Sequence, residues 1–203
     1  MDIFFSPLAC SLASRITLYE TGQTANFQRV DTRAGRTAAG EDYRKINPKG
    51  LVPALRTDDG GVITENAAIL QYLADQRPDA GLAPQGFARY QLQQWLSFIG
   101  SELHKLVFTP LLSPTFPPES KTKAAADAVS RLAYLNGHLT GRDWLLDEFS
   151  VADAYLGTVL NWNTVTKLDF GPYPAIRAYQ ARLMTRPAVV KAMQEEFALY
   201  QPA

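Results

Sequence analysis

Short apolar runs alternate with helical patterns at the start of the chain. The run Ile3-Phe4-Phe5 ends at Ser6-Pro7 and predicts a buried strand. Apolar residues at helical spacing follow over 10–19, with Gly22 as a stop signal. Apolar and polar residues alternate over 27–31, which predicts a half-buried strand.

The next segment contains a hairpin signal. Residues 32–40 are polar and contain two glycines, which predicts a loop, and a helical turn is expected over 42–46. Two apolar runs, 52–56 and 62–64, flank Asp58-Asp59-Gly60-Gly61 and predict a β-hairpin. A helical pattern over 67–73 follows. We therefore expect a small mixed sheet with helices packed on it.

From Phe87 onward the strand signal largely disappears. Long helices are expected over about 87–106 and 121–139, and shorter ones over 174–185 and 188–199. Ser150-Val151-Ala152-Asp153 has the pattern of a capping box and predicts another helix start. The expected domains are an α/β domain over 1–79 and an all-helical domain over 87–203.

Composition and charge exclude several functional classes. The 203 residues contain 20 Lys and Arg and 20 Asp and Glu, so there is no positive excess to bind nucleic acid. Neither a signal peptide nor a membrane-spanning stretch is evident, and we expect a cytoplasmic protein. One cysteine and two histidines argue against a disulfide or a metal site.

That one cysteine is the first candidate for chemistry. Cys10 follows the first strand and lies at the predicted start of a helix. Backbone N–H groups at a helix start stabilise a nearby negative charge, which favours the reactive thiolate. A buried structural cysteine is the equally weighted alternative.

Two further segments carry candidate binding groups. The first is Asn47-Pro48-Lys49-Gly50-Leu51-Val52-Pro53, in which a proline enters a predicted strand. The Val52–Pro53 bond is either cis, which would expose backbone groups for a ligand, or Pro53 is a plain edge-strand proline. Thr64-Glu65-Asn66 precedes a helix that Thr64 or Asn66 would cap. Its N–H groups suit a carboxylate and Glu65 an ammonium group, although an ordinary capped helix explains the pattern equally well.

The helical half offers weaker candidates. His104 and Lys105 lie near the end of the long helix, after Ser101. A lone histidine there is more often structural than functional, and Trp162 at helical spacing is usually a core residue.

Taken in order, these motifs resemble a cytosolic glutathione transferase over essentially the whole chain, and most closely the bacterial beta class, which carries a cysteine where other classes carry Tyr or Ser. The resemblance implies a thioredoxin-like N-terminal domain with a mixed sheet, an all-helical C-terminal domain and a homodimer. From the charge and composition we expect no metal, no nucleic acid and no membrane partner.

The resemblance also implies roles for individual residues. Cys10 would face the sulfur of glutathione, with cis-Pro53 and the Val52 backbone at its cysteinyl part and Glu65 and Asn66 at its γ-glutamyl end. His104, catalytic with Cys10, and Lys105 would lie near the sulfur and the glycyl end. Leu51 and Ser101 would complete the glutathione site, and the electrophile would contact Phe108, Phe116 and Trp162.

Two positions depart from the beta-class pattern. Gly35 stands where relatives carry a Lys that reaches the glycyl carboxylate, and Arg36 is the expected substitute. Ser97 stands where some relatives carry an Asn that reaches the partner subunit's ligand.

The expected activity is conjugation of glutathione to a hydrophobic electrophile, with thiol–disulfide exchange or peroxide reduction through Cys10 as a second chemistry. The alternatives are a non-catalytic binding or stress protein of the same superfamily, and a specialised isomerase or dehalogenase of aromatic breakdown.

Overall fold

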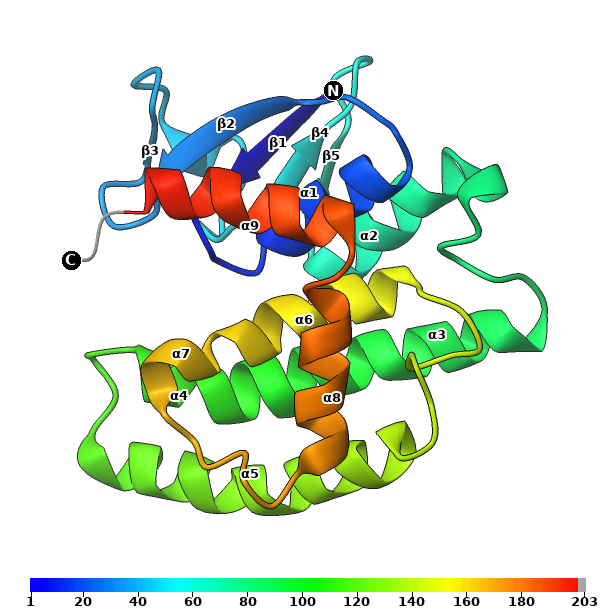
Figure 1. Ribbon diagram of the computed structural model, residues 1–203. Helices are drawn as coiled ribbons and strands as arrows, with labels where there is room; N and C mark the ends of the chain where they lie inside the picture. Colours follow the sequence, from blue (N-terminus) through cyan, green and yellow to red (C-terminus); the bar gives the residue numbers. More distant parts are fainter. Residues whose placement is uncertain (201–203) are drawn as a thin grey trace. The chain divides into compact units, whose positions relative to one another are not determined.

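The computed structural model describes residues 1–200, which divide into two compact units (Figure 1). The first unit contains Met1–Ala83 together with the segment that begins at Pro187, and the second contains Pro84–Arg186. The last helix thus belongs with the first unit, although sequence order assigns it to the helical part. The domain limits of 1–79 and 87–203 stay predictions.

A five-stranded mixed sheet forms the centre of the first unit. Its strands are β1 (Asp2–Phe5), β2 (Asn26–Asp31), β3 (Arg36–Thr37), β4 (Ala54–Arg56) and β5 (Val62–Thr64), in the order β3-β2-β1-β4-β5. Only β1 and β2 are parallel, and β4 and β5 form the predicted hairpin. The fold class is confirmed, but β3 lies within the segment predicted as a loop.

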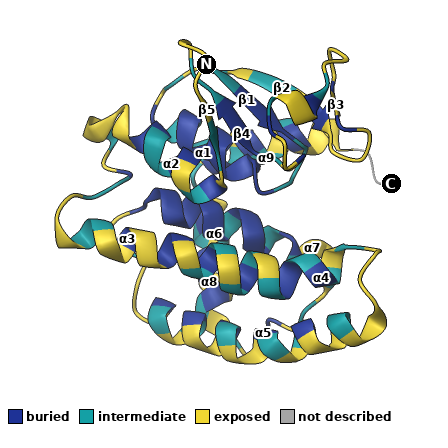
Figure 2. Ribbon diagram, turned by 180° about the vertical axis from the view of Figure 1, so that it is seen from behind, coloured by how far each residue is buried: buried dark blue, intermediate teal, exposed yellow. Residues whose placement is uncertain are grey.

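The strands bury side chains on both faces of the sheet. Because side chains alternate along a strand, Ile3 and Phe5 join a core cluster with Leu18 and Ile69 on one face. Phe4 packs on the other face in a cluster with Tyr43. Figure 2 shows β1 and β4 as the most buried part of the sheet. The helices of this unit are α1 (Leu12–Glu20), η1 (Tyr43–Lys45), α2 (Asn66–Asp75), η2 (Pro78–Ala80) and α9 (Pro187–Leu199).

The second unit is helical throughout its described elements. They are α3 (Phe87–Phe98), η3 (Ile99–Phe108), α4 (Thr109–Leu112), α5 (Pro118–Leu139), α6 (Val151–Asn161), α7 (Asn163–Thr166) and α8 (Pro174–Leu183). The expectation of one regular helix over 87–106 is wrong in its second half, because η3 is a π-helix. Both the N–H and the hydroxyl of Thr109 donate to the carbonyl of His104, five residues earlier. Pro110 has no N–H with which to continue the regular ladder.

The predicted capping box begins α6. The N–H and the hydroxyl of Ser150 each donate to Asp153 Oδ2 at 2.9 Å. The buried Asp153 carboxylate also accepts hydrogen bonds from the N–H of Leu145 and from the hydroxyl of Tyr179, at 2.9 and 3.0 Å. Asp153 therefore joins the preceding loop, α6 and α8.

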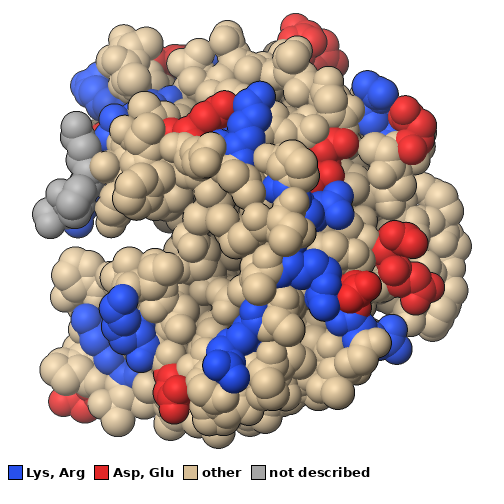
Figure 3. Space-filling view, in the orientation of Figure 1, with Lys and Arg blue, Asp and Glu red and all other residues tan. Residues whose placement is uncertain are grey.

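Charges of both signs are present on the surface, as the balanced composition predicts. Figure 3 shows Lys and Arg interspersed with Asp and Glu on the face it presents. Among residues 1–200, no helix has an apolar stretch long enough to cross a membrane.

Candidate functional site

Cys10 lies in the turn between β1 and α1. It precedes the first helical residue, Leu12, by two positions, and its side chain is nearly buried, with 8% of the residue exposed. The turn is closed by Ser11, whose hydroxyl lies 3.3 Å from the N–H of Ser6 and 3.2 Å from its carbonyl oxygen. The thiol of Cys10 donates to the carbonyl oxygen of Val52, with 3.2 Å between Sγ and O. This contact joins two of the motifs singled out in the sequence.

The motif Thr64-Glu65-Asn66 also contacts the Cys10 segment, through Asn66. Its side-chain Nδ2 donates to the carbonyl oxygen of Cys10 at 3.1 Å, so the expectation that Thr64 or Asn66 caps α2 is wrong. The hydroxyl of Thr64 instead accepts a hydrogen bond from Lys49. The Oδ1 atom of Asn66 is buried and has no hydrogen-bond partner among the described residues. A buried acceptor of this kind is costly to leave unpaired and suits an N–H donor from a ligand.

Glu65 stands between the hairpin and α2 in an unusual backbone conformation. Its φ of 70° lies in the left-handed region, and no side chain caps the helix that follows. The Glu65 side chain is 71% exposed and pairs with the ammonium group of Lys49. The start of α2 therefore presents backbone N–H groups beside a carboxylate that already holds a cation.

The loop before β4 is held by hydrogen bonds to one carbonyl. The hydroxyl of Tyr43 and Nδ2 of Asn47 donate to the carbonyl oxygen of Leu51 at 2.8 and 2.7 Å. The next peptide, Val52–Pro53, is cis. Burial raises the pKa of Tyr43 to about 12, so the hydroxyl remains a donor at neutral pH. Tyr43 carries no signal in the sequence pattern, because its helical turn lies outside every motif.

Arg36 lies on the edge strand β3, which β2 and β1 separate from β4. Its guanidinium donates to the carbonyl of Gly40 at 2.9 Å.

A different arginine, Arg44, lies beside the loop that leads to Val52. A Cβ atom at Gly50 would be 3.6 Å from Cζ of Arg44. Nothing in the sequence pattern singled out Arg44.

In the second unit, His104 is held among aromatic side chains. Its Nδ1 lies 2.7 Å from the hydroxyl of Tyr155, and its ring centroid lies 4.8 Å from that of Trp162. Trp162 also contacts the buried Phe108, with 5.9 Å between ring centroids. Tyr155 is a further residue that sequence reasoning missed, because it reads as part of an apolar helix face.

The other predicted residues of this unit are exposed. Ser101 and Lys105 are exposed on η3, and the hydroxyl of Ser101 donates to the carbonyl of Ser97 at 2.8 Å. Phe116 is 38% exposed in the segment between α4 and α5. Within residues 1–200, no group of three His, Cys, Asp or Glu side chains is arranged to hold a metal ion.

Comparison with known proteins gives a consistent result over both units. Residues 9–76 match the family described as glutathione S-transferase, N-terminal domain, and residues 101–187 match glutathione S-transferase, C-terminal domain. The chain is 44% identical over 199 residues to glutathione S-transferase GstA of Escherichia coli O157:H7, which covers 97% of this chain and 98% of that protein.

Two solved structures are similar along nearly the whole chain. A sphingomonad glutathione S-transferase complexed with glutathione has 46% identity and a TM-score of 0.92, covering 97% of this chain and 99% of that one. A bacterial beta class glutathione S-transferase from Sphingomonas chungbukensis has 43% identity and a TM-score of 0.93, covering 97% and 98%. This chain therefore belongs to the glutathione S-transferase family, and its resemblance to the bacterial beta class is confirmed.

Proposed function

We propose that this enzyme binds glutathione on its first unit and joins the glutathione, through its sulfur, to a hydrophobic electrophile. The observation that carries the proposal is the pair of hydrogen bonds that join Cys10 to Val52 and to Asn66. They bring three segments that are distant in sequence to one place, and the similar sphingomonad structure is a complex with glutathione.

The groups around Cys10 match the chemistry of the tripeptide. We propose that the backbone of Leu51 and Val52, before cis-Pro53, pairs with the cysteinyl part. The start of α2 suits the α-carboxylate of the γ-glutamyl end, with Glu65 for its ammonium group. The unpartnered Oδ1 of Asn66 is a further acceptor for an N–H of the ligand. For the glycyl carboxylate, Arg36 stays a proposal.

The reaction needs glutathione as its thiolate. Hydrogen-bond donors near the sulfur lower the thiol pKa, and the proton leaves to solvent. The thiolate then attacks the electrophile, a carbon–sulfur bond forms, and the leaving group departs with its electron pair. His104 and Lys105 are proposed near the sulfur and the glycyl end, with Ser101 beside them. Phe108, Phe116 and Trp162 are proposed as walls for the electrophile, supported by the contact between two of these rings.

Cys10 supports a second chemistry on the same substrate. Its thiolate attacks a mixed disulfide of glutathione, which forms a Cys10–glutathione disulfide and releases the other thiol. A second glutathione thiolate then attacks this disulfide, which restores Cys10 and leaves oxidised glutathione. One cysteine restricts the chain to this monothiol route.

The exposed apolar residues and the composition support proposals for the oligomeric state and the cellular location. We propose a homodimer, supported by Phe87 and Tyr90 of α3, which are large apolar residues 78% and 68% exposed. Sedimentation at micromolar concentration tests it, and Tyr90→Glu is expected to shift the protein toward monomer. The balanced charge and the single cysteine support a cytoplasmic location.

Retention on a glutathione resin, together with conjugation of 1-chloro-2,4-dinitrobenzene, tests the main proposal. We expect both, and we expect Glu65→Gln to weaken glutathione binding. Glu119→Gln, an exposed glutamate in the first turn of α5, is the matched control and leaves binding unchanged. A chain that neither binds the resin nor forms the conjugate overturns the proposal.

A further inference from the structure

A buried carboxylate near the end of α9 contacts the segment that carries Cys10. Glu196 has 0% exposure. Its Oε2 accepts a hydrogen bond from the backbone N–H of Leu8 at 2.8 Å, and its Oε1 accepts one from Nε of Arg15 at 2.9 Å. Both oxygens are therefore used within the first unit, and one of them holds the backbone two residues before Cys10.

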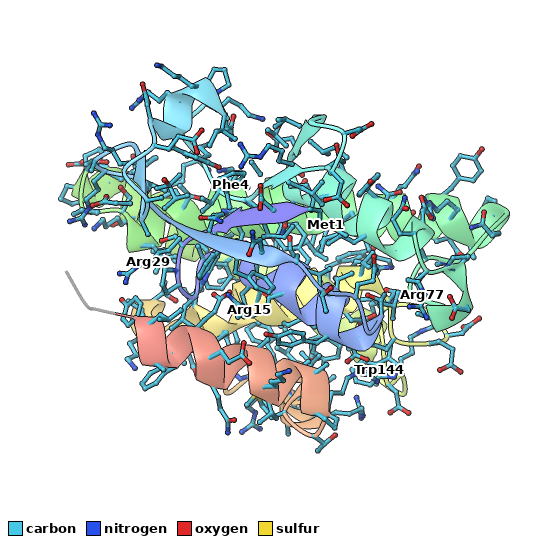
Figure 4. All side chains as sticks on the ribbon, turned by 90° about the horizontal axis from the view of Figure 1, so that it is seen from above. Met1, Phe4, Arg15, Arg29, Arg77 and Trp144 are labelled. Carbon is cyan, nitrogen blue, oxygen red and sulfur yellow. The ribbon has the colours of Figure 1, made fainter. Side chains whose placement is uncertain are left out.

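Arg15 fixes this carboxylate relative to the sheet. Its guanidinium carbon lies 3.6 Å from the ring centroid of Phe27 and 4.8 Å from that of Phe5. Its Nη1 also lies 3.1 Å from Oε2 of Glu195. Figure 4 shows Arg15 on α1 in the region between the strands and α9. The buried charge is thus paired and stacked, so Glu196 has little freedom to move.

Leu8 needs an external partner to hold its conformation. Its φ of 59° lies in the left-handed region, which is sterically unfavourable for a residue with a Cβ. Such a conformation persists only when the surrounding structure imposes it. The hydrogen bond from Leu8 to Glu196 is a contact that does so, and the strained residue lies directly between Pro7 and Ala9-Cys10.

We propose that Glu196 is a positioning residue for Cys10: through the N–H of Leu8 it holds the turn that aims the thiol at the carbonyl of Val52. This inference rests on the proposed function for its effect on catalysis. The geometry of the thiol itself can be tested without any activity, because Cys10 is the only thiol in the chain.

The test substitutes Glu196→Gln and measures two quantities at a temperature where the variant is folded. The first is the rate of Cys10 alkylation by iodoacetamide as a function of pH, and the second is kcat and KM for conjugation. Leu8 and Arg15 donate to different oxygens of Glu196, and in Gln an NH2 group, which only donates, replaces one of them, so one of the two donors loses its acceptor. We expect the alkylation rate and its pH profile to change. We expect kcat for conjugation to fall by less than about tenfold, because the glutathione thiolate, and not Cys10, attacks the electrophile.

Glu195→Gln is the matched control, because it removes a charge from the same arginine but leaves the contact with Leu8 in place. It should leave Cys10 alkylation unchanged. Leu8→Gly, combined with Glu196→Gln, should restore part of the alkylation profile, because glycine adopts the left-handed conformation without steric cost.

An unchanged alkylation profile in folded Glu196→Gln, or an equal change in Glu195→Gln, overturns the proposal. If Glu196→Gln does not fold, Glu196→Asp keeps the charge beside Arg15 but shortens the side chain, and the same change in alkylation is expected. Alkylation that responds as expected in a protein without conjugating activity would overturn only the proposed function.

Discussion

Cys10 donates to Val52 O and accepts through its own backbone from Asn66, so its side chain and its main chain are tied to different motifs. Replacing the thiol should therefore separate the two proposed chemistries. Cys10→Ala should abolish exchange with a mixed disulfide of glutathione. Conjugation should fall by less than about tenfold, because the glutathione thiolate is the attacking group in that reaction.

Parallel assays with a mixed-disulfide substrate and with 1-chloro-2,4-dinitrobenzene measure this separation. Cys10→Ser, which keeps a hydroxyl donor for Val52, is the matched variant and should also lack exchange. Full exchange activity in the alanine variant would show that Cys10 is not the exchanging thiol.

The ion pair of Glu65 with Lys49 occupies the carboxylate proposed for the ligand's ammonium group. Lys49→Met should lower the KM for glutathione by about two- to fivefold, because an exposed pair is worth up to about 1 kcal/mol. Glu65→Gln should raise the KM for glutathione by about tenfold or more, as expected for a lost hydrogen bond to a charged group. Steady-state kinetics with varied glutathione measure both, and two changes of the same sign would contradict the assignment.

Tyr43 supports the Leu51 carbonyl together with Asn47. Tyr43→Phe should lower the free energy of unfolding by about 1 kcal/mol at pH 8, since Asn47 still satisfies that carbonyl. The pKa of Tyr43 is raised above its ordinary value of 10.0 to about 12, so the folded state favours the neutral phenol. Stability from this shift is present below pH 10 and is lost as pH rises toward 12.

Urea unfolding at pH 8, 10 and 11 compares the wild type with Tyr43→Phe. The difference between the two proteins should shrink as pH rises. A difference that grows above pH 10 would show that the raised pKa is assigned to the wrong group.

The sequence motifs identified individual site residues but not the residues that they contact. Cys10, Val52 and Asn66 were singled out from the sequence, and the structure brings them together. The contacts of Glu65 with Lys49 and of Leu51 with Tyr43 depend on how loops fold back on the sheet. Periodicity carries no information about such contacts, and a charged or aromatic residue in a loop has many possible partners.

Among the elements, regular helices and central strands followed from hydrophobic spacing. The two-residue strand β3 did not, because it is too short for any alternation to be visible. The π-helical turns of η3 were also missed, because a bond between residues five apart leaves the apolar spacing nearly helical. Both exceptions depend on backbone pairing rather than on side-chain pattern.

The capping box of α6 depends on the carboxylate of Asp153. Asp153→Ala removes the acceptor of Leu145, Ser150 and Tyr179, and should cost at least about 3 kcal/mol because buried donors lose their partner. Ser150→Ala removes one hydroxyl and should cost about 1 kcal/mol, or about 2–4 °C in Tm. Thermal unfolding followed by circular dichroism compares them, and equal losses would contradict the central role of Asp153.

For the whole molecule, the grouping of α9 with the first unit predicts a pattern of local stability. α9 packs on α1, and Arg15 joins it to the sheet. Native-state hydrogen exchange of α9 amides should therefore follow that of α1 and differ from that of α8. Exchange measured at several urea concentrations tests this, and α9 amides that follow α8 would contradict the grouping.

The position of α9 also has a consequence for synthesis on the ribosome. Arg15 and Glu196 are 181 residues apart, so at about 5–20 residues per second the arginine is made about 10–40 s before its buried partner. Throughout that interval the nascent first unit carries a cation with no carboxylate from α9. Its folding can be completed only when α9 has been translated, after every helix of the second unit has been made.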